Sequence, residues 1–202
     1  LKNLHERNDT LAIQHTEFSI SDKNQLFKLL QENGRALEYA NHELRADKEL
    51  VLCAVKQKGR ALKFASPELC DDFDCVLAAV TQNGKALEYA SDELKSNLEI
   101  VSAAVKNNGS ALVFANDQLK SSPAVVLVAV AQNGGALKFA ADNLRSDDEL
   151  VLAAVKLKGR ALEFGTEELR ADKNIVLAAV GENDWAFAYA SDELRANKDF
   201  AM

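Results

Sequence analysis

Hydrophobic and polar residues recur along this chain with a period of twenty-five residues. In the unit 47–71, the apolar side chains Leu50, Val51, Ala54 and Val55 follow the i, i+1, i+4, i+5 spacing of a helix. The residues between them are also mostly apolar, which predicts burial on nearly all sides. A glycine and a second, shorter apolar run follow. Each unit is therefore expected to form a long helix, a glycine turn, a short helix and a one-turn segment, α or 3-10.

Seven such units follow one another without insertion or deletion. Each opens with a residue that can cap a helix N-terminus, namely Asp22, Asp47, Asp72, Asn97, Ser122, Asp147 and Asp172. Each long helix is followed by a glycine, which we expect to adopt a left-handed conformation, and Asp184 takes the last of these places. Units of this size bury their apolar surface only against neighbours. The sequence thus predicts an all-α fold, an α-solenoid of seven repeats over residues 22–202.

The first 21 residues fit the register poorly, and we expect residues 1–21 to form a degenerate N-terminal capping unit. Phe18 and Ile20 are its candidates for the core position that leucine fills elsewhere. The chain begins without Met and ends inside what looks like another unit. We therefore expect it to be a segment of a longer protein.

Charge and hydrophobicity argue against two classes of partner. The net charge is −7, so both nucleic acid and an anionic membrane surface would be repelled on average. No run of about eighteen apolar residues is present, so we expect no membrane insertion. A protein partner is the remaining expectation, and the oligomeric state stays open.

The chain has three cysteines, at positions 53, 70 and 75, and this small, odd number argues against a disulfide scaffold. Cys53 and Cys75 share register positions with apolar residues, which predicts that both are buried in the core, whereas Cys70 replaces a basic residue and should be more exposed. Free thiols of this kind indicate the cytosol or another reducing compartment.

Candidate chemistry is sparse. The string from Cys70 to Cys75 has a metal-like set of sulfur and oxygen atoms, but Asp72 is also the helix cap and Cys75 a core position. The histidines His5, His15 and His42 are far apart in the register. We therefore expect no catalytic residues, no metal, no cofactor and no enzymatic activity.

The segments 147–156 and 158–164 resemble the repeat catalogued as Domain of Unknown Function 4116, and so do 83–91 and 192–194. The resemblance covers roughly residues 20–202, with Asp184 replacing glycine and Gly165 replacing alanine as departures. It implies tandem helical arrays, found in secreted effectors of intracellular bacteria and in protist and algal proteins. It implies no known reaction and no functional residues. If this chain is such an effector, its place would be the host cytosol.

Two places depart from the repeat consensus on positions expected at the surface. Phe73, Leu98 and Pro123 are successive apolar residues at a position that carries charge in flanking units. Trp185 ends a basic series that includes Arg160, and an exposed tryptophan favours a partner contact. Burial against neighbouring units is the alternative for both places.

The sequence therefore favours a non-catalytic, protein-binding or scaffolding solenoid whose partner contacts are Phe73, Leu98, Pro123, Arg160 and Trp185. Two alternatives stay open. The array could position substrate for an enzyme whose catalytic domain lies outside this segment, or it could be a structural spacer.

Overall fold

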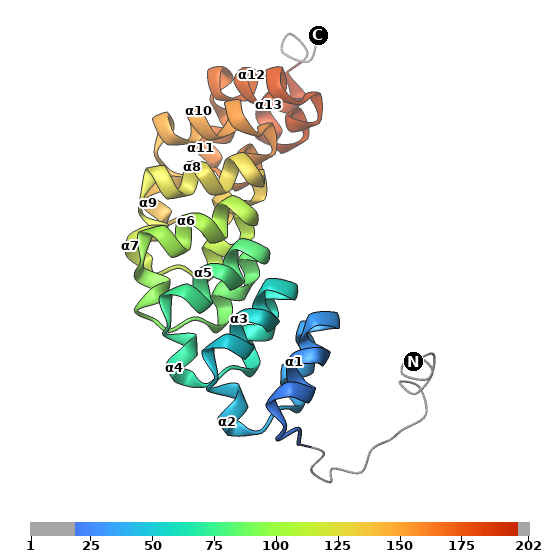
Figure 1. Ribbon diagram of the computed structural model, residues 1–202. Coiled ribbons are helices and arrows are strands. Elements are labelled where there is room, and N and C mark those ends of the chain that lie inside the picture. Colours follow the sequence, from blue (N-terminus) through green and yellow to red (C-terminus); the bar gives the residue numbers. More distant parts are fainter. Residues whose placement is uncertain (1–18, 198–202) are drawn as a thin grey trace.

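Each repeat folds as three consecutive helical segments, and the repeats stack so that equivalent segments form three rows (Figure 1). The computed structural model describes residues 19–197. The expected capping unit, residues 1–21, thus lies almost entirely outside the described residues, as do Phe18, His5 and His15. Within the described range the predicted all-α solenoid of seven repeats is confirmed, since the one extended pairing there is an isolated bridge between Ile20 and Ala40.

The first row consists of seven α-helices of ten residues each: α1 (Lys23–Glu32), α3 (Lys48–Gln57), α5 (Phe73–Gln82), α6 (Leu98–Asn107), α8 (Pro123–Gln132), α10 (Asp148–Leu157) and α12 (Lys173–Glu182). The second row consists of seven 3-10 helices: η2 (Gly34–Tyr39), η3 (Gly59–Phe64), η4 (Gly84–Tyr89), η6 (Gly109–Phe114), η7 (Gly134–Phe139), η8 (Gly159–Phe164) and η9 (Asp184–Tyr189). The third row consists of single turns: α2 (His42–Arg45), α4 (Pro67–Cys70), η5 (Leu94–Ser96), α7 (Asp117–Lys120), α9 (Asp142–Arg145), α11 (Glu167–Ala171) and α13 (Asp192–Ala196).

The predicted caps form as expected. Asp47 accepts hydrogen bonds from the backbone N–H groups of Glu49 and Leu50, and the equivalent residues cap five of the other long helices in the same way. Ser122 makes no such bond, but Pro123 begins α8 and has no N–H to satisfy. The caps fix where each long helix begins.

The repeat glycines are not left-handed, which corrects the prediction from sequence. Among the described residues no glycine has a positive φ, and each of these glycines is the first residue of a 3-10 helix. Glycine is required for another reason. A β-carbon on Gly59 would collide with the backbone carbonyl oxygen of Ala79, one repeat further on, and Gly34, Gly84 and Gly109 meet the next repeat in the same way. The glycines that share this position of the repeat, which we call the glycine column, therefore mark a close approach between the backbones of successive repeats.

The core runs unbroken along the array between the first two rows. Val51 and Ala54 are fully buried, as are their equivalents in the following repeats. Leu62 of η3 and its equivalents fill the space between the 3-10 helices and the long helices. The long helices are not buried on all sides, however, because Leu52 and Cys53 lie on a half-exposed face. The prediction of burial on nearly all sides was therefore wrong, and Cys53 is only partly buried, packed against the core.

One backbone hydrogen bond joins the third segments of neighbouring repeats. The N–H of Ser66 donates to the carbonyl of Arg45 at 2.9 Å, and Ser91 donates to Cys70 at 2.9 Å. At the N-terminal end, Asn41 donates to the carbonyl of Ile20 at 2.9 Å. Ile20 is buried, so it does contribute to the core. Its hydrogen bond with Asn41 shows, however, that it occupies the repeat position of Arg45 and not that of the neighbouring core leucine, Leu44.

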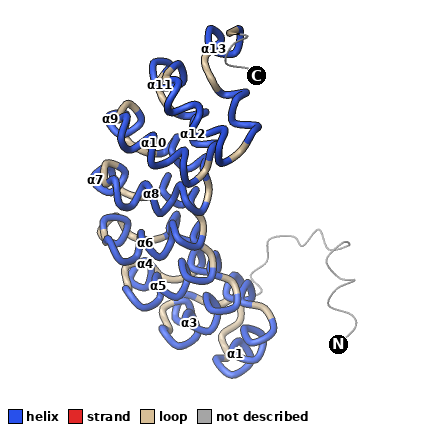
Figure 2. Tube along the Cα trace, turned by 90° about the horizontal axis from the view of Figure 1, so that it is seen from above, coloured by secondary structure: helices blue, strands red, loops and turns tan. Residues whose placement is uncertain are grey.

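The rows bow into an arc, with α4, α7 and α9 along its outer edge (Figure 1). Figure 2 shows the short segments α7, α9 and α11 to one side of the long helices α8, α10 and α12. The long helices begin near this outer edge and end near the inner one, where the 3-10 helices start. The array thus has an outer edge, an inner edge and the half-exposed face of the long helices.

Candidate partner-binding surfaces

The first candidate surface lies at the outer edge and consists of Phe73, Leu98 and Pro123, which we call the outer patch. These three residues are the first residues of α5, α6 and α8, in consecutive repeats. All three are exposed, Phe73 by 36% and Leu98 by 58%. The alternative of burial under neighbouring units is therefore excluded for Leu98. The stacking of the repeats brings these positions into one series along the edge.

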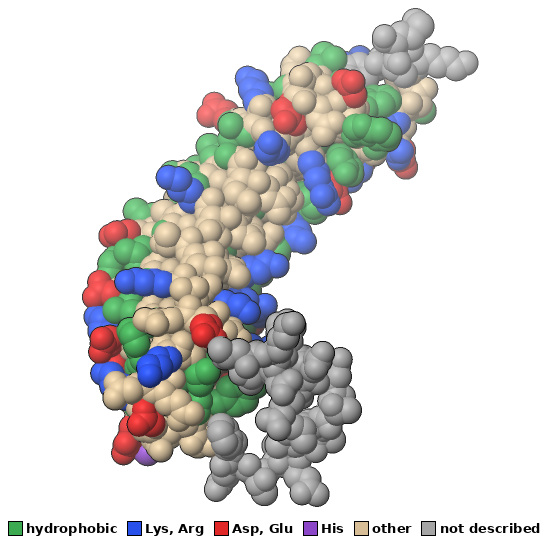
Figure 3. All heavy atoms as spheres, turned by 45° about the vertical axis from the view of Figure 1, so that its right-hand side comes forward, with side chains coloured by type: hydrophobic (Ala, Val, Ile, Leu, Met, Phe, Trp, Pro, Cys, Tyr) green, Lys and Arg blue, Asp and Glu red, His purple; other side chains and the backbone are tan. Residues whose placement is uncertain are grey.

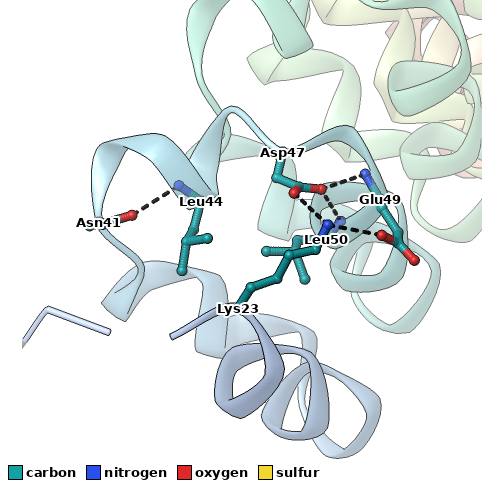
Figure 4. Close-up of polar contacts among 6 residues, drawn as sticks. All are labelled: Lys23, Asn41, Leu44, Asp47, Glu49 and Leu50. Carbon is teal, nitrogen blue, oxygen red and sulfur yellow. Dashed lines mark hydrogen bonds and ion pairs between the residues drawn. The ribbon is translucent and has the colours of Figure 1, made fainter. Parts of the chain in front are cut away.

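In the first two repeats the same position holds an ion-paired lysine. Lys23 Nζ lies 2.8 Å from Asp47 and 3.0 Å from Glu49 of the next repeat (Figure 4). Lys48 likewise contacts Asp72 at 2.8 Å and Asp74 at 2.7 Å. The outer patch thus begins where a cross-repeat ion pair is replaced by apolar side chains.

The second candidate surface lies at the inner edge and consists of Arg160 and Trp185, which we call the inner patch. Each residue follows the first residue of its 3-10 helix, η8 for Arg160 and η9 for Trp185, so they lie in adjacent repeats. Trp185 is 83% exposed, which excludes packing against neighbouring described residues. Arg160 Nε is 3.2 Å from Glu163 within its own helix, so its guanidinium remains at the surface.

The structure does not bring the two patches together. The outer patch lies at the N-terminal ends of the long helices, and the inner patch lies just beyond their C-terminal ends. The two ends of a ten-residue helix are about 15 Å apart. The two patches also lie in different repeats, the outer patch in the third to fifth and the inner patch in the last two. A single small ligand could not contact both, so they are two separate candidate surfaces.

Sequence reasoning missed a depression on the 3-10 row, which we call the basic depression. It has a volume of about 270 Å³ and is lined by Arg35, Lys58, Arg60, Ala61, Lys63, Phe64 and Tyr89. The available signal was Lys58, which stands where Asn33, Asn83, Asn108 and Asn133 stand in other units and which recurs as Lys158 in the sixth unit. Since lysine at this position makes no capping hydrogen bond, its side chain is free for another use.

A second missed feature is an apolar groove between α3 and α5. It encloses about 570 Å³ and is lined by Leu52, Lys56, Asp74, Leu77, Ala78, Thr81 and Gln82. The same face continues toward the C-terminus with Val128, 42% exposed, and Leu177, 57% exposed. The sequence pattern predicted burial for Leu52, Leu77 and Leu177 because leucine recurs at this position of the repeat.

A third missed feature holds the repeats together. The backbone N–H of Gly59 donates to Gln82 Oε1 at 2.6 Å, twenty-three residues further on. Equivalent bonds join Gly84 to Asn107, Gly109 to Gln132 and Gly159 to Glu182. At Gly134 the partner position is Leu157, which carries no acceptor. We call this hydrogen bond the glycine latch.

The cysteines are not poised as nucleophiles. Burial, with a contribution from Asp72, raises the pKa of Cys75 to about 12. Burial also raises the pKa of Cys70 and of Cys53. Within residues 19–197 no group of three or more His, Cys, Asp or Glu side chains is placed to hold a metal ion. Asp72, from the metal-like string, caps α5 by accepting from the N–H of Cys75 at 3.0 Å.

No helix in the described part of the chain combines the length and hydrophobicity needed to cross a bilayer. The chain matches no curated protein and no solved structure. The sequence profile described as domain of unknown function (DUF4116) matches residues 22–70, 72–120, 124–170 and 172–202. Each of the first three matches covers about two of the structural repeats. These four tandem matches, on a repeat whose caps, glycines and core columns all appear in the structure, show that the chain belongs to the DUF4116 family.

Proposed function

We propose that this array is a non-catalytic, protein-binding solenoid that uses the outer patch as a contact surface. The observation that carries the proposal is the 58% exposure of Leu98 at a position where the first repeats hold an ion-paired lysine. Exposing leucine gives the fold no benefit, because its side chain would gain free energy by leaving water.

The neighbours of Leu98 support the same role. Phe73 and Pro123 precede and follow it in the stack, so three consecutive repeats present an apolar edge. Protein interfaces typically have an apolar core that is buried on binding and a polar rim that stays accessible to solvent. Here Asp72, Asp74 and Glu99 supply such a polar surround, since they lie at the first turns of the same helices.

The test is affinity capture from native cytosol with the double variant Phe73→Ser, Leu98→Ser. We expect the variant to keep its helical circular dichroism spectrum and to lose a partner that the unchanged protein retains. The matched control is Val113→Ser, Val128→Ser, which removes two apolar side chains of 38% and 42% exposure outside the outer patch.

Undiminished capture by the outer-patch variant would contradict the proposal, and so would equal loss by the control. Loss of the helical spectrum would show that Phe73, the less exposed of the two, contributes to the stability of the stack. In that case Leu98→Lys, which restores the residue type of the first repeats at the more exposed position, provides the measurement without disturbing the stack.

A further inference from the structure

The basic depression combines cationic and aromatic side chains from three consecutive repeats. Arg35 comes from η2, Lys58, Arg60, Lys63 and Phe64 come from the second repeat, and Tyr89 comes from η4. An Arg60 amino group (Nη2) donates to the hydroxyl of Tyr89 at 2.6 Å, and the guanidinium carbon lies 5.6 Å from the centre of the tyrosine ring. These contacts tie adjacent repeats together across the depression and hold Arg60 in place.

The positive charge of the depression is only partly balanced. Arg35 pairs with Glu38 at 2.8 Å, and Arg60 pairs with Glu88 at 3.3 Å. The ion pairs of the described residues include none for Lys58 or Lys63. Lys63 Nζ instead lies 4.5 Å from the centre of the Phe64 ring. Two cations therefore face solvent without a carboxylate partner, on a chain whose net charge is −7.

The fold does not require these cations. Two repeats further on, the positions of Lys58, Arg60 and Lys63 are held by Asn108, Ser110 and Val113, and η6 forms the same 3-10 helix. In the repeat after that, Asn133 and Gly135 replace the first two, and η7 is again unchanged. Lys158 and Arg160 recur in the sixth repeat, but Glu163 takes the third position there and pairs with Arg160 at 3.2 Å. The three cations occur together in the second repeat alone, and the same fold forms without that combination in the other repeats.

We propose that the basic depression binds a short acidic peptide segment of a partner protein. This inference names a partner chemistry for the protein-binding role proposed above and rests on it, at a surface separate from the outer patch. Carboxylates would pair with Lys58 and Lys63, and the partly satisfied guanidinium groups of Arg35 and Arg60 would add hydrogen bonds. The rings of Phe64 and Tyr89 provide apolar contact between the charges.

The size of the depression sets the length of the segment. Three stacked repeats span two layers, or about 20 Å at the usual spacing of packed helices. An extended peptide covers that distance with about six residues. A long polyanion such as nucleic acid would extend past the depression onto the rest of a negatively charged chain, so the charge distribution favours a short acidic peptide. Figure 3 shows Lys and Arg side chains interspersed with Asp and Glu side chains along the visible face of the array.

The test is fluorescence anisotropy with a labelled peptide of eight glutamates. We expect binding that weakens as the NaCl concentration rises, because the contacts are ionic. The variant Lys58→Glu, Lys63→Glu should weaken binding by about tenfold or more, and Lys58→Arg, Lys63→Arg should retain it. The matched control is Lys106→Glu, Lys156→Glu, which changes the net charge equally at exposed positions of the long helices and should have little effect.

Three outcomes would overturn the inference. These are absence of peptide binding, equal weakening by the control variant, and tighter binding of an eight-nucleotide oligothymidylate than of the peptide. None of them touches the outer patch, whose capture assay is independent, so failure here is distinguishable from failure of the proposed function. Circular dichroism melting of each variant verifies that the array remains folded.

Discussion

The backbone N–H of Gly109 donates to the side-chain oxygen of Gln132 at 2.6 Å, and the carbonyl oxygen of Ala129, from the same helix α8, occupies the space that a β-carbon on Gly109 would need. One residue therefore meets the next repeat through both a hydrogen bond and a backbone contact. Because equivalent pairs recur along the array, the spacing between repeats depends on the missing side chain of each glycine.

Replacing Gly109 with alanine or asparagine should destabilise the array by about 1–3 kcal/mol, the usual cost of overpacking. The reason is the collision with Ala129, so asparagine should be no better than alanine. Asparagine tolerates a left-handed backbone, and would be accepted if that conformation were what the position required. Chemical denaturation of both variants provides the measurement.

Gly181 supplies the control, because its replacement with alanine should raise the stability of the array instead of lowering it. It lies in the last turn of α12, is exposed, and a β-carbon there would meet nothing within 4 Å. Gly181→Ala should therefore stabilise the array through helix propensity, by less than the roughly 1 kcal/mol that this exchange gives in a helix interior. Equal effects of the two alanine substitutions would contradict the argument from close approach.

The glycine latch should be transferable between repeats. Gln132→Leu removes the acceptor of the buried Gly109 N–H and should cost about 1–3 kcal/mol, the penalty for an unsatisfied buried donor. Leu157→Gln introduces an acceptor opposite Gly134 and should stabilise the array by about 0.5–1.5 kcal/mol. Differential scanning calorimetry of the two variants and the double variant is the measurement.

The local packing at Gly134 makes this test informative. There a β-carbon would first meet the side chain of Lys158 rather than a backbone carbonyl of the next long helix. The junction between α8 and α10 thus differs from its neighbours where the latch is missing. If Leu157→Gln leaves the melting temperature unchanged, this junction is held by its altered packing and not by the absence of an acceptor.

Acid should weaken the array through the caps that also form ion pairs. Burial raises the pKa of Asp72, but the hydrogen bonds from Lys48 and from the N–H of Cys75 outweigh it, and the net pKa is lowered. A lowered folded-state pKa means that the ionised carboxylate stabilises the fold. That contribution is complete above the unfolded pKa of about 3.9 and is lost as the pH falls through the lower folded value.

Asp72→Asn should therefore reduce the loss of stability between pH 5 and more acidic conditions, at the expense of some stability at pH 7. Asparagine is a matched replacement, because Asn97 caps α6 at the equivalent position by accepting from Glu99 and Ile100. The measurement is the denaturation midpoint at several pH values. A pH dependence identical to that of the unchanged protein would contradict a role for Asp72.

The architecture was predictable because the caps, the valine and alanine columns and the glycine recur without a gap. The conformation of the glycine was not, since a left-handed turn and a close contact both select glycine. The choice depends on Ala79 and its equivalents, which belong to another repeat. Single-repeat reasoning contains no information about that distance.

Some of the candidate surfaces were likewise predictable from the sequence and others were not. Leu98 and Trp185 break the consensus of a single column, so the sequence alone indicated both, and their exposure supports surface positions. The basic depression combines Arg35, Lys58 and Tyr89 from three repeats and three different columns. Only the stacking geometry brings these residues together, and a column-by-column reading could not find them.

The inner patch can be tested with its own fluorophore, since Trp185 is the single tryptophan of the chain. At 83% exposure its indole should emit as in water and be quenched readily by acrylamide. If a captured partner contacts Arg160 and Trp185, adding it should shift the emission to shorter wavelength and reduce quenching, because desolvated aromatic and arginine side chains anchor interfaces. The outer-patch variant Phe73→Ser, Leu98→Ser should leave the emission of the free protein unchanged, since the two patches lie at opposite ends of the long helices and in different repeats. Emission that remains water-like in a saturated complex would remove Trp185 from the interface and leave the outer patch and the basic depression as the surfaces to test.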